Sequence, residues 1–583
     1  MHTIKEQKEP LLSFEFAGSE GEIHPLTFRN PMKIICATTV EDVMGCLMEV
    51  EEAVDQGFYA AGYLSYEAAQ AFDKAMKVNK ESEMPLLWFG IYAEPLQETV
   101  GSNGRYTISE WVPSVSVDEY HSAIKSIKES IENGDTYQTN YTIRLNSLFK
   151  GDEIAFFDKL RRAQSSNYSA YLQTGDYSIL SASPELFFHL KGNKLTTRPM
   201  KGTIKRGKTS DEDEAMADEL YHSDKNRAEN VMIVDLLRND LSVVAKTGTV
   251  KVEKLFEIER YPTVHQMTST ITAEIKEDIA LTDIFKALFP CGSITGAPKI
   301  RTMEIIEELE GSPREVYCGT IGYITPAKEA IFNVPIRTVM IKNETGKATY
   351  GVGGGITWDS TAEDEYHEVV AKALLLEEER PLFSLLESLL LSDGEYLLLD
   401  EHLERLQASA KYFNYEVTIE SIRSDLLRHA ESFSNGDYKV RLLVNRTGEP
   451  VIEVQPIAKQ SPDLKCRLAD QPIDQNNPFL YHKTTNREVY AEFQRKYPDS
   501  YDVLLWNNEG ELTEFTNGNL IVEMDDAYYT PPVSSGLLAG TFRNSLILGG
   551  KVLEKTLTVE DLEKCQNIWF INSVRKWVPI TLI

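Results

Sequence analysis

The chain has 583 residues, 42% of them hydrophobic and 26% charged, so it is longer than one hydrophobic core normally supports. Its net charge of −30 argues against nonspecific binding to nucleic acid. The six cysteines lack the spacing of a disulfide framework or zinc site, and no signal segment or membrane-spanning apolar run is present, so we expect a cytoplasmic protein that binds neither nucleic acid nor membrane.

The sequence of the N-terminal part of the chain indicates two regions. Residues 1–105 mix short β-like runs with loops. Apolar residues at helical spacing predict a helix over 118–133. Residues 106–378 then alternate β-rich segments with helices and hold most of the chemically unusual residues, so we expect a catalytic domain there.

A domain boundary is expected near residue 380. Ser360 with Glu363 three positions later predicts a capping box, which would start a helix over 360–379. The polar stretch that follows ends in Pro381, a natural helix stop. We therefore expect a separate domain over 379–583.

Lys201 and two glycine-rich loops suggest a site for a small anion. Lys201 lies in the run Arg-Pro-Met-Lys-Gly-Thr. The loop 292–299 leads into an amphipathic helix, so its amides could hold an anion, and the loop 351–355 is also rich in amides. Neither loop has Walker A or dinucleotide spacing. Arg337 could clamp a carboxylate.

Three glutamates suggest a magnesium site. Glu229 lies on a largely apolar predicted helix, and Glu365 and Glu368 are three residues apart on one helix face. Each alone would usually be a solvated surface charge. Brought together by two helices, they would be hard oxygen ligands of the kind that Mg²⁺ prefers.

The order of the motifs resembles that of the chorismate-utilising enzymes, a family that includes anthranilate, isochorismate and salicylate synthases and aminodeoxychorismate synthase component I. The motifs are Tyr137–Asn140, Ser181–Glu185, Arg198–Thr203, the Glu229 helix, Gly292–Lys299, Gly319–Tyr323, Gly351–Gly355 and Asp364–Glu368. The resemblance is strong over 110–375 and loose over 1–105. It implies an α+β fold with a large domain of β-sandwich type.

Within this family, lysine at 201 with glutamine at 138 is similar to the aminodeoxychorismate synthases. The resemblance implies that Lys201, with a lowered pKa, attacks chorismate, and that Glu185 is the general acid. It also implies that Glu229, Glu365 and Glu368 hold Mg²⁺, and that a separate glutamine amidotransferase supplies ammonia. The implied substrate-binding residues are Gly202, Thr203, His265, Thr295, Tyr323, Arg337, Gly353 and Gly354.

A second site in the last third resembles the class IV aminotransferases, a family that includes aminodeoxychorismate lyase. Lys483 is followed 31 residues later by Glu514, and Arg405 lies upstream. The resemblance implies an α/β domain of fold type IV in which Lys483 binds pyridoxal 5′-phosphate covalently, Glu514 faces the pyridine nitrogen and Arg405 binds the phosphate. The further implied cofactor contacts are Asn519, Thr541 and Phe542, the last in place of a common threonine.

Together the two resemblances imply a bifunctional enzyme that makes 4-aminobenzoate for folate synthesis, with a possible homodimer through the C-terminal domain. Three alternatives stay open. The second domain could be a true D-amino-acid or branched-chain aminotransferase. The first could be an anthranilate or isochorismate synthase, against which Lys201 and Gln138 speak. Either half could instead be a regulatory or scaffold module.

Overall fold

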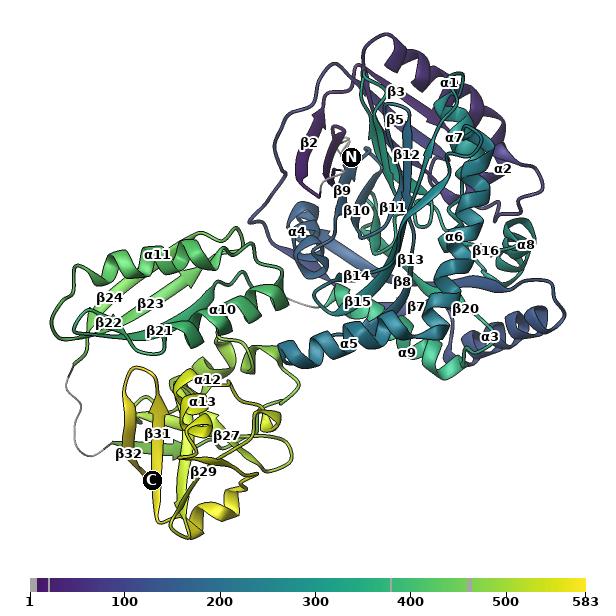
Figure 1. Cartoon of the computed structure of the whole chain (residues 1–583). Helices are drawn as coiled ribbons and strands as arrows, with labels where there is room; N and C mark the ends of the chain where they lie inside the picture. The colour runs from purple at the N-terminus through teal and green to yellow at the C-terminus, as the bar shows by residue number, and fades with distance from the viewer. Residues whose placement is uncertain (1–7, 19–20, 378–379, 459–463) are drawn as a thin grey trace, which may run out of the picture. The chain divides into compact units, whose positions relative to one another are not determined.

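The computed structural model describes residues 8–18, 21–377, 380–458 and 464–583, which divide into two compact units (Figure 1). Unit 1 takes the described residues up to Lys205 together with Asp218–Arg380. Unit 2 takes Arg206–Ala217 and Pro381–Ile583, so a short segment from the middle of unit 1 in the sequence packs with unit 2. In the part of the chain described, no helix is long and apolar enough to cross a membrane.

Unit 1 is built on two ten-stranded sheets, and the first has the order β16-β8-β20-β19-β10-β9-β1-β2, with β6 and β7 also paired to β8. Its strands are β1 (Leu11–Ala17), β2 (Ile23–Arg29), β6 (Tyr106–Ile108), β7 (Val112–Pro113), β8 (Gln138–Gly151), β9 (Tyr168–Gln173), β10 (Tyr177–Ser183), β16 (Gly296–Ala297), β19 (Thr338–Lys342) and β20 (Lys347–Ile356). The long pairing of β8 with β20 sets Asn140 opposite Gly355, which brings two of the sequence motifs together.

The second sheet has the order β13-β15-β12-β11-β18-β17-β4-β5-β3, with β14 paired to β15. Its strands are β3 (Lys33–Ala37), β4 (Tyr59–Leu64), β5 (Leu87–Tyr92), β11 (Leu186–Lys191), β12 (Lys194–Arg198), β13 (Met200–Lys205), β14 (Lys251–Arg260), β15 (Val264–Glu274), β17 (Thr320–Ile324) and β18 (Ala330–Asn333). The largest buried cluster joins β1 of the first sheet to β4 and β17 of the second, so the core of unit 1 includes residues from both sheets.

Helices flank these sheets. They are α1 (Val40–Asp55), α2 (Ala69–Phe72), α3 (Val117–Glu132), α4 (Glu153–Gln164), α6 (Asp224–Val244), α7 (Leu281–Leu288), α8 (Lys299–Leu309) and α9 (Ala362–Ala373), with short 3-10 turns η1 (Tyr66–Ala68), η2 (Gly292–Ile294) and η3 (Leu374–Leu376). The helix predicted over 118–133 is confirmed as α3, and Ser116 with Glu119 forms its capping box.

The predicted cap of α9 is wrong. Thr361, not Ser360, is the N-cap, and its hydroxyl accepts a hydrogen bond from the Asp364 amide at 3.2 Å. The buried Ser360 hydroxyl instead accepts from the Thr357 amide at 3.1 Å and donates to the Glu365 carboxylate at 2.6 Å. The helix ends at Ala373, and residues 378–379 of the prediction lie outside the described residues.

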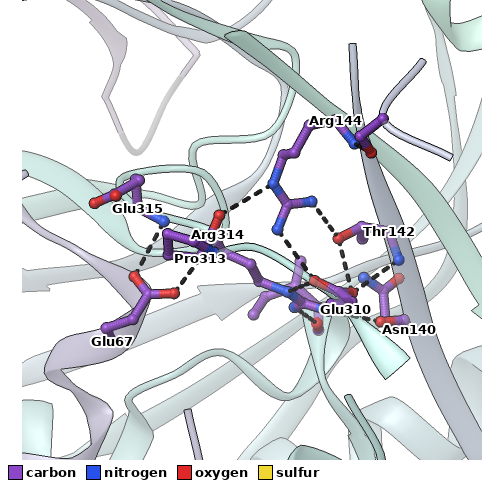
Figure 2. A network of polar contacts seen from close by, with 10 residues as sticks. Glu67, Asn140, Thr142, Arg144, Glu310, Pro313, Arg314 and Glu315 are labelled. Atoms are coloured by element: carbon purple, nitrogen blue, oxygen red, sulfur yellow. Dashed lines mark hydrogen bonds and ion pairs between the residues drawn. The ribbon is translucent and has the colours of Figure 1, made fainter. Parts of the chain in front are cut away.

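A buried ionic network beside β8 connects Arg144, Glu310 and Arg314 (Figure 2). The Glu310 carboxylate, just after α8, accepts from Arg144 at 3.1 Å and from Arg314 at 2.6 Å. Although burial alone would raise the pKa of Glu310, the two guanidinium groups hold it below its usual value. Arg314 also donates to the backbone carbonyls of Asn140 and Ile294, each at 2.8 Å, so the network fixes two loop positions.

Removing the charge of Glu310 should therefore destabilise unit 1. Glu310→Gln would leave two buried guanidinium groups without a counter-charge, at a cost of about 3–5 kcal/mol. Calorimetric unfolding should show a clearly lowered midpoint for one transition. The matched control is Glu304→Gln within α8, which removes a partly exposed pair with Arg301 and should cost under about 1 kcal/mol. Equal effects of the two changes would contradict a structural role for the network.

Unit 2 has a four-stranded sheet in the order β22-β21-β23-β24 and an eight-stranded sheet in the order β27-β26-β25-β32-β31-β28-β29-β30. The strands are β21 (Leu385–Ser392), β22 (Glu395–Tyr396), β23 (Asp437–Val444), β24 (Pro450–Pro456), β25 (Lys465–Leu468), β26 (Asp502–Trp506), β27 (Leu512–Phe515), β28 (Gly518–Met524), β29 (Ala527–Thr530), β30 (Leu553–Glu554), β31 (Asn567–Asn572) and β32 (Lys576–Leu582). The eight-stranded sheet mixes parallel and antiparallel pairs.

The helices of unit 2 are α10 (Leu399–Phe413), α11 (Ile419–Ala430), α12 (Glu488–Lys496) and α13 (Thr541–Leu548), with 3-10 turns η4 (Pro478–Leu480), η5 (Val533–Ser535) and η6 (Val559–Lys564). Figure 1 shows α10 and α11 packed on the small sheet, and their apolar faces share one buried cluster with it. Helix α5 (Ser210–His222) begins in the unit 2 segment and ends in unit 1. Helices and strands are mixed in both units, which confirms the predicted fold class.

Candidate active sites

Unit 1 contains a cavity of about 340 Å³, a size typical of small-molecule sites. Strands β8 and β20 of the first sheet, β13 of the second, and helices α6 and α9 line it. It brings together the following residues singled out in the sequence: Gln138, Glu185, Lys201, Gly202, Thr203, Glu229, Arg337, Gly353, Gly354, Glu365 and Glu368. Segments far apart in the chain therefore meet at one site.

Lys201 projects from β13 into a space that Gly355 leaves open. A Cβ atom added at Gly355 would lie 2.9 Å from Lys201 Nζ and 1.9 Å from Gln138 Nε2, so a larger residue here would displace both side chains. Burial lowers the pKa of Lys201, and the nearby carboxylates of Glu229 and Glu185 only partly oppose that shift. A lowered pKa increases the neutral, nucleophilic fraction of the amine.

Glu185 is a buried carboxyl group in the same cavity. Burial raises its pKa to about 7, against the opposing effects of a Ser293 hydrogen bond and the Lys201 charge. Among the described residues, Glu185 Oε1 and both amide atoms of Gln138 have no hydrogen-bond partner. Because buried polar atoms are normally paired, this set is suited to a polar ligand. A carboxyl group with this pKa can donate a proton near neutral pH.

The three predicted metal ligands line the cavity, but one of them, Glu368, forms an ion pair with Lys372. The carboxylates of Glu365 and Glu368 lie 3.1 and 3.6 Å from a Cβ position built on Gly354. Lys372 pairs with Glu368 at 2.6 Å and donates to the Gly353 carbonyl at 2.8 Å, and it lowers the pKa of Glu368. Burial raises the pKa of Glu229 and of Glu365.

Within the described ranges, no three acidic, histidine or cysteine side chains are grouped closely enough to form a complete metal centre. The oxygen donors nevertheless suit Mg²⁺ in chemistry, so the magnesium site stays a prediction. Lys372 was missed from the sequence. The signal was its position four residues after Glu368, the spacing of a helical ion pair.

Three predicted substrate residues are not among those that line the cavity. Tyr323 is partly buried against the core, with its ring 5.4 Å from that of Phe14. Thr295 is fully buried and donates to the Cys291 carbonyl at 3.2 Å. His265 is also fully buried, on β15. A family motif predicts only the position of a residue in the sequence. The packing of the neighbouring strands determines whether its side chain faces the cavity.

Unit 2 contains a second cavity, of about 380 Å³, and all six predicted cofactor residues line it: Arg405, Lys483, Glu514, Asn519, Thr541 and Phe542. Burial, together with the charges of Arg487 and Arg405, lowers the pKa of Lys483 to about 7. The cavity thus holds a buried amine that is partly neutral at neutral pH.

Glu514 is held in place on β27. Tyr490 donates to one of its oxygens at 2.8 Å and Asn519 to the other at 3.2 Å. Burial raises the pKa of Glu514 to about 7, a value suited to sharing a proton with a ring nitrogen. Asn519 also donates to the Leu538 carbonyl at 2.8 Å, which links Glu514 to the loop before α13.

The part of the cavity beside Arg405 and α13 suits a phosphate. Glu387 accepts from Arg405 at 2.9 and 2.6 Å and from His402 at 2.6 Å, and His402 contacts the Thr541 hydroxyl at 3.1 Å. Although burial opposes it, the Arg405 charge and the hydrogen bonds from Arg405 and His402 lower the pKa of Glu387 to about 2. The amide end of α13 lies beside Arg405, so charge and helix dipole favour an anion there. Buried amine, carboxyl and anion site together fit pyridoxal phosphate.

Family comparison agrees with this division into two sites. Residues 96–377 match the chorismate binding enzymes, and residues 384–583 match the class IV amino-transferases. Anthranilate synthase component 1 of Methanothermobacter marburgensis is 32% identical over 340 residues, which cover 54% of this chain and 73% of that protein. The chain belongs to the chorismate-binding enzymes. A class IV aminotransferase domain follows, and this domain implies pyridoxal phosphate as its cofactor.

Other chorismate-binding enzymes are also similar. Aminodeoxychorismate synthase component 1 of Salmonella typhimurium is 43% identical over 264 residues, or 45% of this chain. The chain spans only 58% of the length of that relative. The solved menaquinone-specific isochorismate synthase of Escherichia coli, 18% identical, covers 64% of this chain and 88% of its own with a TM-score of 0.52, which supports the shared fold.

The lowered pKa of Lys483 predicts how the rate of pyridoxal phosphate attachment depends on pH. Only the neutral amine can react, so the attachment rate to apoprotein should rise about tenfold per pH unit below pH 7 and level off above it. Stopped-flow absorbance of the lysine-bound cofactor measures this rate, and Lys483→Ala should give no such band. A rate that keeps rising up to pH 10 would show that the pKa of the Lys483 amine is not lowered.

Proposed function

We propose that the chain carries out two successive reactions that convert chorismate to 4-aminobenzoate. The first replaces the C4 hydroxyl with ammonia and gives 4-amino-4-deoxychorismate; the second releases pyruvate. The observation that supports the first step best is the buried, pKa-lowered amine of Lys201 in one cavity with the protonatable Glu185. The similarity to aminodeoxychorismate synthases component 1 supports the choice of C4.

In the first reaction, Lys201 Nζ forms a bond to C2 of the ring. The two ring double bonds shift, and the C4–O bond breaks as Glu185 gives its proton to the departing oxygen, which leaves as water. Ammonia then attacks C4, the double bonds shift back, and the lysine amine leaves. Two displacements retain the configuration at C4, which one direct displacement would invert.

The acidic residues of this site would hold Mg²⁺ in the proposal. Glu229, Glu365 and Glu368 would be its ligands, and the ion would bind the ring carboxylate of the substrate. Arg337, buried in the same cavity, would bind the second carboxylate.

In the second reaction, Lys483 would remove the proton from C4 of 4-amino-4-deoxychorismate. Bound pyridoxal phosphate supplies the electron sink that acidifies this proton. Glu514 would keep the ring nitrogen of this cofactor protonated, and Arg405 with the amides of α13 would hold its phosphate. The C3–O bond then breaks, the enolpyruvyl group leaves as pyruvate, and the ring becomes aromatic.

A group of cations in the second cavity favours this substrate over a simple amino acid. Lys439, Arg441 and Arg575 line it, and burial together with the two arginines lowers the pKa of Lys439. 4-Amino-4-deoxychorismate carries two carboxylates, whereas branched-chain amino acids carry one. The runner-up, a true aminotransferase, would not need so many cations.

We further propose that a glutamine amidotransferase supplies the ammonia, since the relatives are named as component 1 of aminodeoxychorismate synthase, which implies a second component. The cytoplasm is the proposed location, since all six cysteines are free thiols. Homodimerisation through the class IV domain stays a prediction.

Product analysis tests the whole proposal. The chain is incubated with chorismate, ammonium salt, Mg²⁺ and pyridoxal phosphate, and 4-aminobenzoate and pyruvate are quantified without any keto-acid acceptor. Equal amounts of both products are expected. Anthranilate or isochorismate as product would overturn the first assignment, and consumption of an added keto acid in place of pyruvate release would favour the aminotransferase.

Lys201→Ala should reduce chorismate amination by on the order of a thousandfold or more, because it removes the nucleophile. The matched control is Lys205→Ala, at an exposed position of the same strand, which should keep normal activity. Steady-state assays with ammonium salt measure both. Normal activity in Lys201→Ala would exclude the covalent route.

Arg441→Gln combined with Arg575→Gln should raise the KM for 4-amino-4-deoxychorismate by about tenfold to a hundredfold, because charged hydrogen bonds to a carboxylate are lost. Arg446→Gln, at an exposed position after β23, is the control. Pyruvate release gives the rates. An unchanged KM would show that these cations do not bind the substrate.

A further inference from the structure

A row of buried hydrogen bonds links β21, α10 and the start of α13 beside the second cavity. Its centre is His402 of α10, whose Nδ1 atom lies 2.6 Å from a Glu387 oxygen and whose Nε2 atom lies 3.1 Å from the Thr541 hydroxyl. His402 is only 1% exposed and Glu387 only 2%. Thr541 lines the cavity, whereas His402 and Glu387 do not. The imidazole therefore contacts the cavity wall through the threonine.

The Thr541 hydroxyl is the side-chain donor that this chain can offer to an anion at the start of α13. Among Thr541, Phe542 and Arg543, the first three residues of the helix, only Thr541 has a hydroxyl. Phe542 also lines the cavity, but it can offer an anion only its backbone amide. The direction in which the Thr541 hydroxyl points its one proton therefore matters for a phosphate bound here.

For the protein alone, a neutral imidazole satisfies every contact in this row. Glu387 accepts two hydrogen bonds from Arg405, and its pKa of about 2 makes it an ionised carboxylate that can only accept. The Nδ1 atom of His402 must therefore carry a proton, while Nε2 can accept from Thr541. Burial lowers the pKa of His402, and the charges of Arg405 and Lys483 add to that shift, whereas the facing Glu387 opposes it.

A phosphate dianion in contact with Thr541 would change the direction of one of these hydrogen bonds. A phosphate ester loses its second proton with a pKa of about 6, so near pH 8 it can only accept. A hydroxyl has a single proton, so Thr541 cannot donate to the phosphate and to His402 at once. The Nε2 atom must then donate to the threonine oxygen, while Nδ1 still donates to Glu387. With a proton on both nitrogens, His402 becomes an imidazolium.

We propose that His402 takes up one proton when pyridoxal phosphate binds, and that the resulting imidazolium turns the Thr541 hydroxyl toward the phosphate. Thr541 thereby supplies the hydroxyl that Phe542 lacks. The proton passes from solvent to Nε2, and no bond between heavy atoms forms or breaks. Glu387 stabilises the added charge. Both His402 and Glu387 are positioning residues, because they touch no reacting atom. The inference rests on the binding of pyridoxal phosphate at this site and not on the reaction that follows.

Isothermal titration calorimetry of the full chain at pH 8 counts the protons. The Lys483→Ala chain prevents covalent attachment, so pyridoxal phosphate binds it in a simple equilibrium. Binding is measured in buffers without primary amines that differ in ionisation enthalpy, and the slope gives the number of protons taken up. Lys483→Ala should take up about one proton more than Lys483→Ala combined with His402→Gln. Protons exchanged by Glu514 and by the cofactor ring are common to both chains and cancel.

Two changes at Thr541 in the same Lys483→Ala chain separate the proposal from a general effect on packing. Thr541→Ser keeps the hydroxyl and should keep the proton uptake. Thr541→Val keeps the shape but should lose the uptake and weaken binding of pyridoxal phosphate about tenfold to a hundredfold, because a hydrogen bond to a charged group is lost. The matched control is His429→Gln, at an exposed position of α11, which should change neither quantity.

Equal proton counts in the Lys483→Ala chain and in its His402→Gln and Thr541→Val variants would overturn the proposal. Failure of pyridoxal phosphate to bind any of these chains would overturn both the proposal and the assigned cofactor. Binding with the expected proton uptake, in a chain whose wild-type form releases no pyruvate from 4-amino-4-deoxychorismate, would support the proposal and overturn the proposed second reaction alone.

Discussion

Desolvation of a lysine amine is the physical condition on which both sites depend. Lys201 and Lys483 each lie in a cavity where burial disfavours the ammonium form, and nearby carboxylates compensate only in part. The same burial raises the pKa of the partner acids, Glu185 and Glu514, each to about 7. Each site therefore pairs an amine made less basic with an acid made weaker, so that both can exchange protons near neutral pH.

Networks of buried polar side chains stabilise the segments that line each cavity. In unit 1, Arg314 spans Glu310 and the carbonyls of Asn140 and Ile294, two positions that border the cavity. In unit 2, Glu387 fixes the orientation of Arg405. The buried groups of these networks are mutually paired, so they keep the site rigid without leaving charges uncompensated. Preorganisation of this kind lets the reacting groups act without rearrangement.

Much of this arrangement was predictable from sequence, because the information was local. The α3 helix follows from apolar spacing, and the motifs around Lys201, Glu229, Lys483 and Glu514 identify both cavities. Residues of one short motif are neighbours in the sequence, so they stay close together in the folded chain. The glycine-rich run at 351–355 also marks a close approach of backbone to side chains, but it forms part of strand β20 and not the loop expected from the sequence.

The rest depended on contacts between distant segments. Tyr323 lies in a motif, yet its position on β17 turns the ring into the aromatic core. Ser360 has good capping chemistry, but its hydroxyl accepts from the Thr357 amide and donates to the buried Glu365 carboxylate. Residues 206–217 lie between β13 and α6 of unit 1 in the sequence, and only tertiary packing reveals that they belong with unit 2. Local patterns cannot specify which partner a side chain finds across the fold.

The most direct test of this account is mass spectrometry of the chain after a rapid acid quench with chorismate in the absence of ammonia. Lys201 should then carry an adduct with the mass of chorismate less one water, since the second displacement has no nucleophile. Absence of that adduct at every reaction time, in protein that aminates chorismate at full rate once ammonium is added, would contradict covalent catalysis by Lys201.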